Sequence, residues 1–333
     1  MPLNPRDSGK LISSLAKHVK INELGVQKLG DELLKSINSG ELSIESFSQN
    51  DVHPKYTNWW AIDWLFVVDA LNYCFWSKEH ESGWTVEGKT GYFALCVAIN
   101  RAMRENVDIL NAKYYSVISR DDLKEILRSD NEVDVPLLDD RVKCLHEAGS
   151  VLLEKFDGSF INCVKKAENS AVKLLDIIIS NFKCFRDEAS YKGHEVSLYK
   201  RAQILIGDIW ACHRGEGLGK FKDIEEITMF ADYRVPQSLL YYNVIEYSNE
   251  LNDLLKKNNY LENGNEMEVE IRGVSIHAVE LLREYITKKL GKDDSKKVNS
   301  IIIDHFLWDF RRKHAKEILK IGLPFHKTFC IYY

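Results

Sequence analysis

The sequence predicts a mainly α fold: one compact helical domain over residues 1–333 with a few short β-strands. Apolar residues recur at helical spacing in several long segments, whereas the candidate strands are short. Strands and helices do not alternate in the rhythm that builds a parallel sheet. With 45% hydrophobic residues against 18 Gly and 6 Pro, the chain has ample apolar material for a core. We expect residues 1–50 to be a lead-in segment of this domain.

Helical periodicity is clearest where apolar side chains repeat every three or four positions. Ser159 is a candidate N-cap, because its hydroxyl can accept a hydrogen bond from a first-turn amide. Pro236 suits the first turn of another helix, since its φ is already helical. We predict helices over residues 137–156, 159–182, 199–213, 274–290 and 298–314. Strand candidates are residues 84–86, 194–198, 268–271 and 329–333.

Charge and cysteine usage exclude several classes of protein. The chain has 45 Lys and Arg against 50 Asp and Glu, a net charge of −5, whereas proteins that grip a nucleic-acid backbone concentrate basic residues. Seven cysteines without C-x-x-C spacing indicate free thiols in a reducing compartment. The N-terminus lacks an apolar signal core, and carboxylates interrupt the most apolar stretch, residues 59–76. We expect a cytoplasmic protein with no stable nucleic-acid or membrane binding.

The Gly-rich segment 213–221 was tested against the P-loop pattern. Arg214 stands where that pattern requires its first Gly, and Phe221 stands where it requires Ser or Thr. A turn between helices that uses Gly for left-handed φ is the favoured interpretation. The alternative is a hairpin that brings a helix N-terminus near a phosphate.

The segment around Asp232 combines charged and aromatic residues. Asp232 stands between Phe230 and Tyr233, directly before Arg234 and the helix of Pro236. Such a set suits a flat anionic ligand, because the aromatics stack, the cation holds the anion and the acid reacts. The alternative is a helix N-cap at Asp232 with a solvated Arg234.

A second candidate is the Lys200–Arg201 pair at the head of an apolar helix, which could clamp a phosphate. A solvated surface pair is the alternative for these two residues.

The apolar helix predicted at 298–314 carries Asp304, His305, Trp308 and Asp309. Acids in such a helix are costly unless partnered, which favours a lined pocket over the alternative of a buried structural network. The same choice applies to a second set on one helical face: Asp69, Asn72 and Trp76. Neither a HExxH motif nor a second His at ligand spacing is present, so we expect no metal and no cofactor.

Long strings in this chain resemble one family, the eukaryotic queuosine salvage proteins, which are queuosine 5'-phosphate N-glycosylases/hydrolases. The resemblance runs from Leu3 to Tyr333. The strings that carry it are FVVDALNYCFW, YYSVISRDDLKEILRSD, LLEKFDGSFINCV, YKRAQILIGDIW, FKDIEEITMFADYRVPQ, VEIRG, IIIDHFLWDF and CIYY.

This resemblance implies a helical fold similar to helix-hairpin-helix DNA glycosylases, and hydrolysis of queuosine 5'-monophosphate to release queuine for tRNA. On the MFADYR string, Asp232 would be the catalytic carboxylate and Phe230 a base contact. On the IIIDHFLWD string, Asp304, His305 and Asp309 would bind queuine. We assign His53 as a further base contact.

Charge and placement add a phosphate site to these assignments: Lys200, Arg201, Tyr233 and Arg234. The chemistry is consistent, because a guanine-type base offers N–H donors that a carboxylate accepts. A carboxylate below C1' can also stabilise an oxocarbenium, attack it or activate water. The alternatives are a non-catalytic helical binding protein for modified nucleotides or bases, and a glycosylase acting on intact tRNA or DNA.

Overall fold

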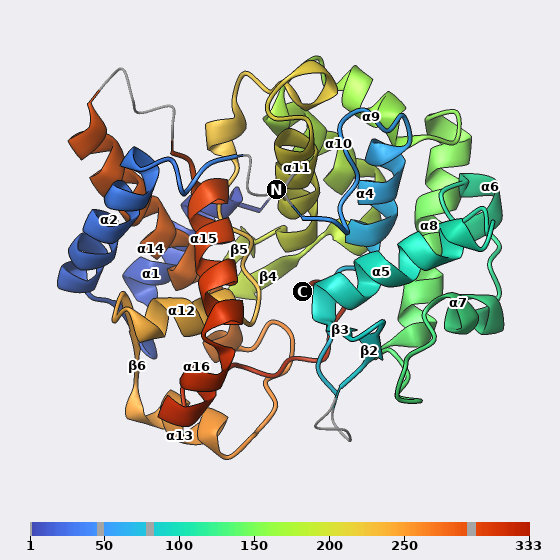
Figure 1. Ribbon diagram of the computed structural model, residues 1–333. Helices are drawn as coiled ribbons and strands as arrows, with labels where there is room; N and C mark the ends of the chain where they lie inside the picture. Colours follow the sequence, from blue (N-terminus) through green and yellow to red (C-terminus); the bar gives the residue numbers. More distant parts are fainter. Residues whose placement is uncertain (1, 45–49, 78–82, 292–297) are drawn as a thin grey trace. The chain divides into compact units, whose positions relative to one another are not determined.

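The computed structural model describes residues 2–44, 50–77, 83–291 and 298–333 (Figure 1). It is mainly helical, with two-stranded antiparallel sheets. The chain forms two compact units, each assembled from three segments. Unit 1 comprises Met1–Ile44, Asp187–Gln203 and Glu225–Phe329, and unit 2 comprises Glu45–Arg186, Ile204–Ile224 and Cys330–Tyr333. A single domain over 1–333 stays a prediction.

Unit 1 is built around α14 (Glu266–Leu290), a long helix buried on most of its circumference. Figure 1 shows α1, α2, α12 and α15 gathered around it, and all four contact it. The helices of unit 1 are α1 (Pro5–Leu15), α2 (Glu23–Asn38), α12 (Val235–Tyr241), α13 (Asn249–Lys256), α15 (Ser300–Lys313) and α16 (Ala315–Ile321). Its sheets pair β1 (Val19–Ile21) with β6 (Ile245–Tyr247) and β4 (Glu188–Tyr191) with β5 (His194–Ser197).

Residues 2–44, which fall in the segment expected as a lead-in, belong to unit 1 and contribute to its core. Ile12 of α1 is fully buried, and a Cβ at Gly273 of α14 would lie 2.4 Å from its Cδ1. The glycine therefore permits a close approach of the two helices.

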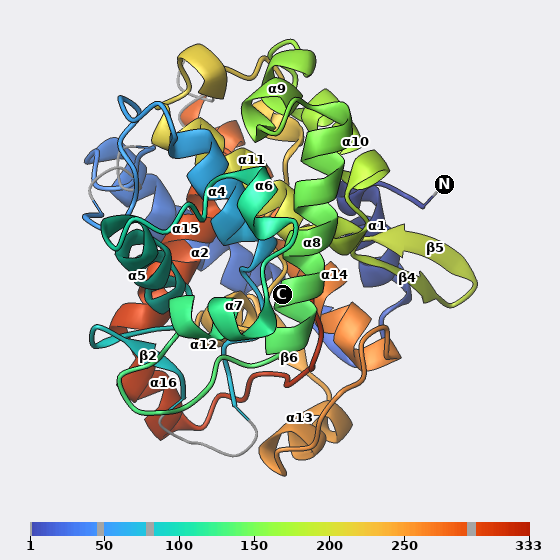
Figure 2. The same cartoon turned by 90° about the vertical axis from the view of Figure 1, so that its right-hand side faces the viewer.

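Unit 2 is organised around α8 (Leu138–Lys155), with α6 and α7 beside it (Figure 2). Stacked phenylalanines fill its interior, with the Phe66 and Phe160 ring centroids 4.4 Å apart. Its helices are α4 (Ala61–Ala70), α5 (Gly91–Arg104), α6 (Ala112–Tyr115), α7 (Arg120–Ile126), α9 (Phe160–Lys166) and α10 (Ala171–Asn181). Short strands β2 (Thr85–Val86) and β3 (Lys89–Thr90) pair beside α5, and the 3-10 turns are η1 (Lys183–Phe185) and η2 (Gly217–Gly219).

Most of the predicted helices are confirmed. Residues 137–156 form α8, residues 199–213 form α11 (Lys200–Cys212), and residues 298–314 form α15. Pro236 lies in the first turn of α12 as predicted. The turn after α11 uses left-handed glycines, with φ of 72° at Gly215 and 53° at Gly217, and leads into η2.

The single helix predicted over residues 159–182 is wrong, because the chain forms α9 and α10 there. Ser159 caps α9 as predicted, its hydroxyl accepting from the Ile161 amide. The break comes at Glu168 and Asn169, which both have left-handed φ, and Ser170 then caps α10. Local capping therefore outweighs the continuous apolar stripe.

Two strand predictions are wrong and two are confirmed. Residues 84–86 and 194–198 contain β2 and β5, but residues 268–271 lie inside α14. The alternation of acidic and apolar residues predicted a strand with one solvated face, but the acidic side chains are buried too. Glu268 pairs with Arg272 one turn further along α14, and Glu270 accepts a hydrogen bond from the His18 amide. Residues 329–333 form no strand.

The described residues also show the state of the cysteines and the apolar character of the helices. All seven cysteines are described, and they are buried thiols rather than disulfides. Among the helices of the described ranges, none is both long and apolar enough to cross a bilayer.

Candidate active site

Asp232 lies at the end of an irregular buried segment and is held by the start of α12. Its Oδ1 accepts hydrogen bonds from the amides of Arg234 and Val235, both at 2.7 Å. Within the described residues, its Oδ2 accepts no hydrogen bond from the protein. The N-cap of α12 is Arg234 and not Asp232, so the capping alternative is wrong in its position. The two hydrogen bonds nevertheless fix the Asp232 carboxylate and leave its other oxygen for a ligand.

Asp304 lies on α15 and is buried, with a relative exposure of 4%. Its Oδ2 accepts from the Phe230 amide at 3.0 Å, which ties α15 to the segment that carries Asp232. Burial raises the pKa of Asp304 well above its ordinary value, and the nearby Asp232 charge raises it further. The Phe230 amide and the Lys200 ammonium lower it in part. The neutral form of Asp304 is therefore favoured.

Lys200 and Arg201 begin α11, and the alternative of a solvated surface pair is wrong. Lys200 is 5% exposed and Arg201 1%. The backbone amide of Lys200 donates to Asp187 Oδ2 at 3.0 Å. Tyr199, directly before the helix, has a left-handed φ of 47°, which is uncommon for a bulky side chain. The charge of Lys200 acts on Asp304, so its ammonium lies near that carboxyl group.

A buried arginine, Arg272 of α14, hydrogen-bonds both the segment that carries Asp232 and the carboxylate of Asp187 at the start of α11. Its guanidinium donates to both carboxylate oxygens of Asp187, at 2.9 and 2.5 Å, and to Glu268 at 3.1 Å. Its Nε donates to the carbonyl of Ala231 at 2.9 Å. Arg272 therefore holds the residue before Asp232 and the carboxylate that fixes the start of α11.

A second buried link joins the same two segments. Gln203, one turn into α11, donates from its amide nitrogen to Thr228 Oγ1 at 2.9 Å. The Thr228 amide donates back to Gln203 Oε1 at 2.9 Å. Both residues are buried, so this pair fixes the segment that leads to Phe230 and Asp232.

The remaining predicted base contacts are placed differently from one another. His305 is half-buried, with its ring centroid 6.2 Å from that of Phe230. Asp309 is exposed, five positions from Asp304 and so on another face of α15. Phe230 is 2% exposed. The structure thus brings Phe230, His305 and Asp304 together and places Asp309 apart from Asp304.

Beside Asp232 lies a cationic group that the sequence analysis recognised only in part. Arg234 stacks on Phe325, with its Cζ 3.9 Å from the ring centroid, so the alternative of a solvated Arg234 is wrong. The Tyr233 ring packs on the same phenylalanine, 5.6 Å between centroids. Arg234 and Arg311 both donate to Gln237 Oε1, each at 3.2 Å.

Arg311 and Gln237 were not predicted as site residues. Arg311 was missed because it stands among the basic residues that end α15, where cations are ordinary helix-dipole partners. A usable signal was its spacing, since seven positions from Asp304 correspond to two helical turns on one face.

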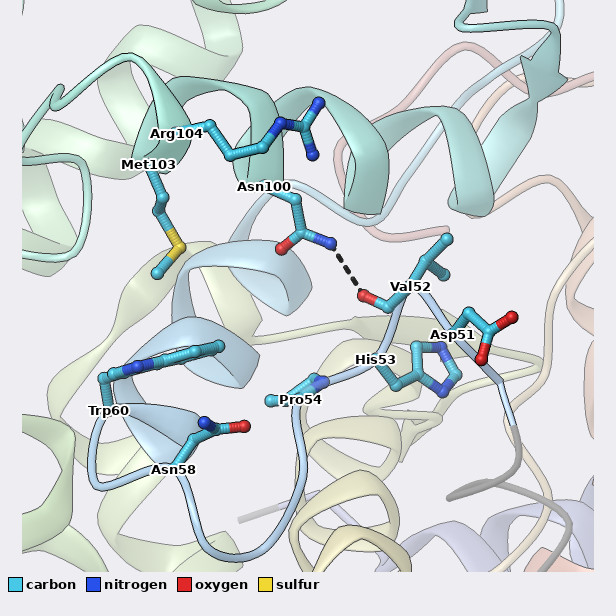
Figure 3. A pocket seen from close by; sticks show the side chains of 9 residues that line it. All are labelled: Asp51, Val52, His53, Pro54, Asn58, Trp60, Asn100, Met103 and Arg104. Carbon is cyan, nitrogen blue, oxygen red and sulfur yellow. Dashed lines mark hydrogen bonds between the residues drawn. The ribbon is translucent and has the colours of Figure 1, made fainter.

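His53 belongs to unit 2, where it lines an open pocket of about 360 Å³ (Figure 3). Aromatic rings lie around its imidazole, among them Tyr92 with centroids 5.6 Å apart. Asn100 supports the loop by donating to the Val52 carbonyl at 2.8 Å. The pocket residues are Asp51, Val52, His53, Pro54, Asn58, Trp60, Asn100, Met103 and Arg104.

The other buried polar set predicted from the sequence is also in unit 2. Asn72 donates to Asp69 Oδ1 at 3.1 Å, and both are buried. Tyr92 donates to Asp208 Oδ2 at 3.4 Å. In the part of the chain that the structure describes, no group of three or more His, Cys, Asp or Glu is arranged to hold a metal.

The structure is that of a mainly helical protein in which unit 1 holds an anchored acid, a second buried acid and adjacent cations. Comparison with known proteins gives the family. The family model of the queuosine salvage protein matches residues 52–333, and the chain belongs to this family.

Curated relatives align over nearly the whole chain. A Bos taurus protein named queuosine 5'-phosphate N-glycosylase/hydrolase is 44% identical, with 99% of each chain covered. A Schizosaccharomyces pombe protein of the same name is 34% identical, covering 97% of this chain and 98% of its own. A Sphaerobacter thermophilus protein, also of that name, is 38% identical over 81% of each chain.

Proposed function

We propose that this chain is an N-glycosidase that hydrolyses queuosine 5'-monophosphate and releases queuine for salvage into tRNA. Membership of the queuosine salvage family and the names of the curated relatives support this reaction. The structural observation that carries it is the Asp232 carboxylate, anchored through one oxygen and with no protein hydrogen bond on the other among the described residues.

Asp232 is the proposed catalytic carboxylate. In the reaction the C1'–N bond breaks, and its electron pair leaves with the base. Water adds its oxygen to C1', where one proton stays on the new hydroxyl, and the other proton ends on the base nitrogen. Positive charge develops on the ribose meanwhile, and a fixed carboxylate stabilises it without reorganisation. The amides of Arg234 and Val235 keep Asp232 in place for that task.

Asp304 is the proposed partner of the base, with Phe230, His305 and Asp309 as further contacts within unit 1. The donors of a guanine-type edge suit a carboxylate acceptor. Because the pKa of Asp304 is raised in the protein without ligand, we expect these donors to favour its charged form and to drive proton release on binding. Calorimetry of queuine binding in two buffers of different ionisation enthalpy measures this proton release.

The test of the reaction is incubation of the protein with queuosine 5'-monophosphate, followed by chromatography for queuine and ribose 5-phosphate. We expect release by the wild type and a loss of at least about 10²-fold in Asp232→Asn, which retains the hydrogen-bonded oxygen but not the charge. Bound base without cleavage by the wild type would instead support a non-catalytic binding protein. Near-normal turnover by Asp232→Asn would remove that residue from the mechanism.

A further inference from the structure

Two arginines of unit 1 converge on one acceptor without an acid partner. Arg234 Nη1 and Arg311 Nε donate to the same oxygen, Gln237 Oε1, each at 3.2 Å. Among the described residues, neither guanidinium forms an ion pair with a carboxylate, and no residue accepts a hydrogen bond from an Nη of Arg311. These donors point to a ligand, because half-buried guanidinium groups are normally paired.

Burial and mutual repulsion disfavour the charged forms of these two arginines. Burial and, after it, the neighbouring charge of Arg234 together lower the pKa of Arg311 to about 10. Burial likewise lowers the pKa of Arg234. An anion between the two guanidinium groups would relieve both the desolvation and the mutual repulsion.

Neighbouring groups hold the two arginines in place. Gln237 is buried and donates from its amide nitrogen to the Leu323 carbonyl at 2.8 Å, which aims its oxygen at the guanidinium groups. Phe325 stacks under Arg234 with 3.9 Å from Cζ to the ring centroid. Fixed guanidinium forks are suited to the oxygens of a phosphate, which they bind in a bidentate manner.

We propose that Arg234 and Arg311 together bind the 5'-phosphate of the nucleotide substrate, with Arg311 as the residue that selects nucleotides over nucleosides. This inference rests on the proposed function and adds a phosphate subsite to it. The position fits, because Asp232 acts electrostatically on both arginines and so lies near them. Phosphate binding there fixes the ribose over Asp232, so remote binding energy contributes to the bond-breaking step.

The test compares Arg311→Gln with Lys313→Gln, which removes one exposed cation from the same turn of α15. Release of queuine is measured from queuosine 5'-monophosphate and from queuosine. We expect Arg311→Gln to lower kcat/KM for the monophosphate by about 10- to 150-fold, as for lost hydrogen bonds to a charged group. The nucleoside should change by less than about threefold, and Lys313→Gln should leave both substrates within about twofold. Equal losses on the two substrates would overturn the proposal.

A binding measurement separates this inference from the reaction itself. Ribose 5-phosphate should bind the wild type and Lys313→Gln in calorimetry and bind Arg311→Gln at least about tenfold more weakly. This holds whether or not the wild type cleaves either substrate, so a failed reaction leaves the phosphate site testable. If inorganic phosphate bound as tightly as ribose 5-phosphate, Arg234 and Arg311 would be a site for free phosphate, and the proposal would be overturned.

A second variant covers the case in which Arg311→Gln does not fold. Arg311→Lys retains the charge without the fork, and we expect an intermediate loss specific to the monophosphate. An unchanged substrate preference in a folded Arg311→Lys would contradict a role for the guanidinium geometry. Circular dichroism establishes which variants are folded.

Discussion

Arg272 offers the sharpest test of how the acid site is held together. Arg272→Met keeps the length of the side chain but removes the guanidinium that bonds Asp187, Glu268 and the Ala231 carbonyl. Both carboxylates are buried, with exposures of 3% and 1%, and would be left without this cation.

The magnitude follows from the cost of an uncompensated buried charge. Breaking one buried ion pair by removing a partner costs about 3–5 kcal/mol. The lost hydrogen bond to the carbonyl of Ala231 adds about 1 kcal/mol. We therefore expect the free energy of unfolding to fall by about 4–6 kcal/mol, a large part of the roughly 5–15 kcal/mol of a folded domain.

Urea unfolding followed by circular dichroism measures this loss. The matched control is Arg283→Met on the same helix, where the guanidinium pairs with Glu280 at 3.1 Å but is 22% exposed. A pair of that kind contributes about 1 kcal/mol or less. If Arg272→Met lowers the free energy of unfolding no more than Arg283→Met does, the hydrogen bonds of Arg272 do not stabilise the fold and the reasoning is refuted.

Two further predictions concern the acid pair and the packing of unit 1. Because the folded pKa of Asp304 is raised, its neutral form stabilises the fold fully below about pH 4, and this contribution is lost as the pH rises through the folded value. Wild type should therefore lose stability with rising pH relative to Asp304→Asn in urea titrations, and parallel profiles would contradict the raised pKa. Gly273→Ala should cost about 1–3 kcal/mol, since its Cβ would meet Ile12 at 2.4 Å. An unchanged urea midpoint would show that α1 can shift without loss.

The sequence predicted the helices well because periodicity and capping are local signals. The start of α12 at Pro236 and the cap at Ser159 depend on neighbouring residues alone, and both are confirmed. The strand prediction for residues 268–271 failed because both acids are buried by partners: Glu268 pairs with Arg272, and Glu270 accepts from the distant His18 amide. Alternation of polar and apolar residues indicates a strand only when the polar side is solvated.

The sequence predicted the site residues in separate segments of the chain, and the structure shows contacts between some of these segments. The hydrogen bond between the Phe230 amide and Asp304 links two strings that family resemblance had selected independently. The sequence did not indicate Arg311 as a site residue, because an arginine near a helix end has many ordinary roles. That it has no acidic partner among the described residues follows only from the three-dimensional structure. The roles of all the predicted site residues, Asp309 and His53 included, stay predictions.

The position of α14 late in the chain also has a consequence for biosynthesis. Glu270 accepts from the amide of Lys17, a contact that spans 253 positions. The helices α1 and α2 therefore leave the ribosome long before the helix that covers them has been made. Contacts of this range are slow to form, and apolar faces that wait for them are open to aggregation. We expect unit 1 to fold after translation is nearly complete, so a truncation before α14 would leave both N-terminal helices without their packing partner.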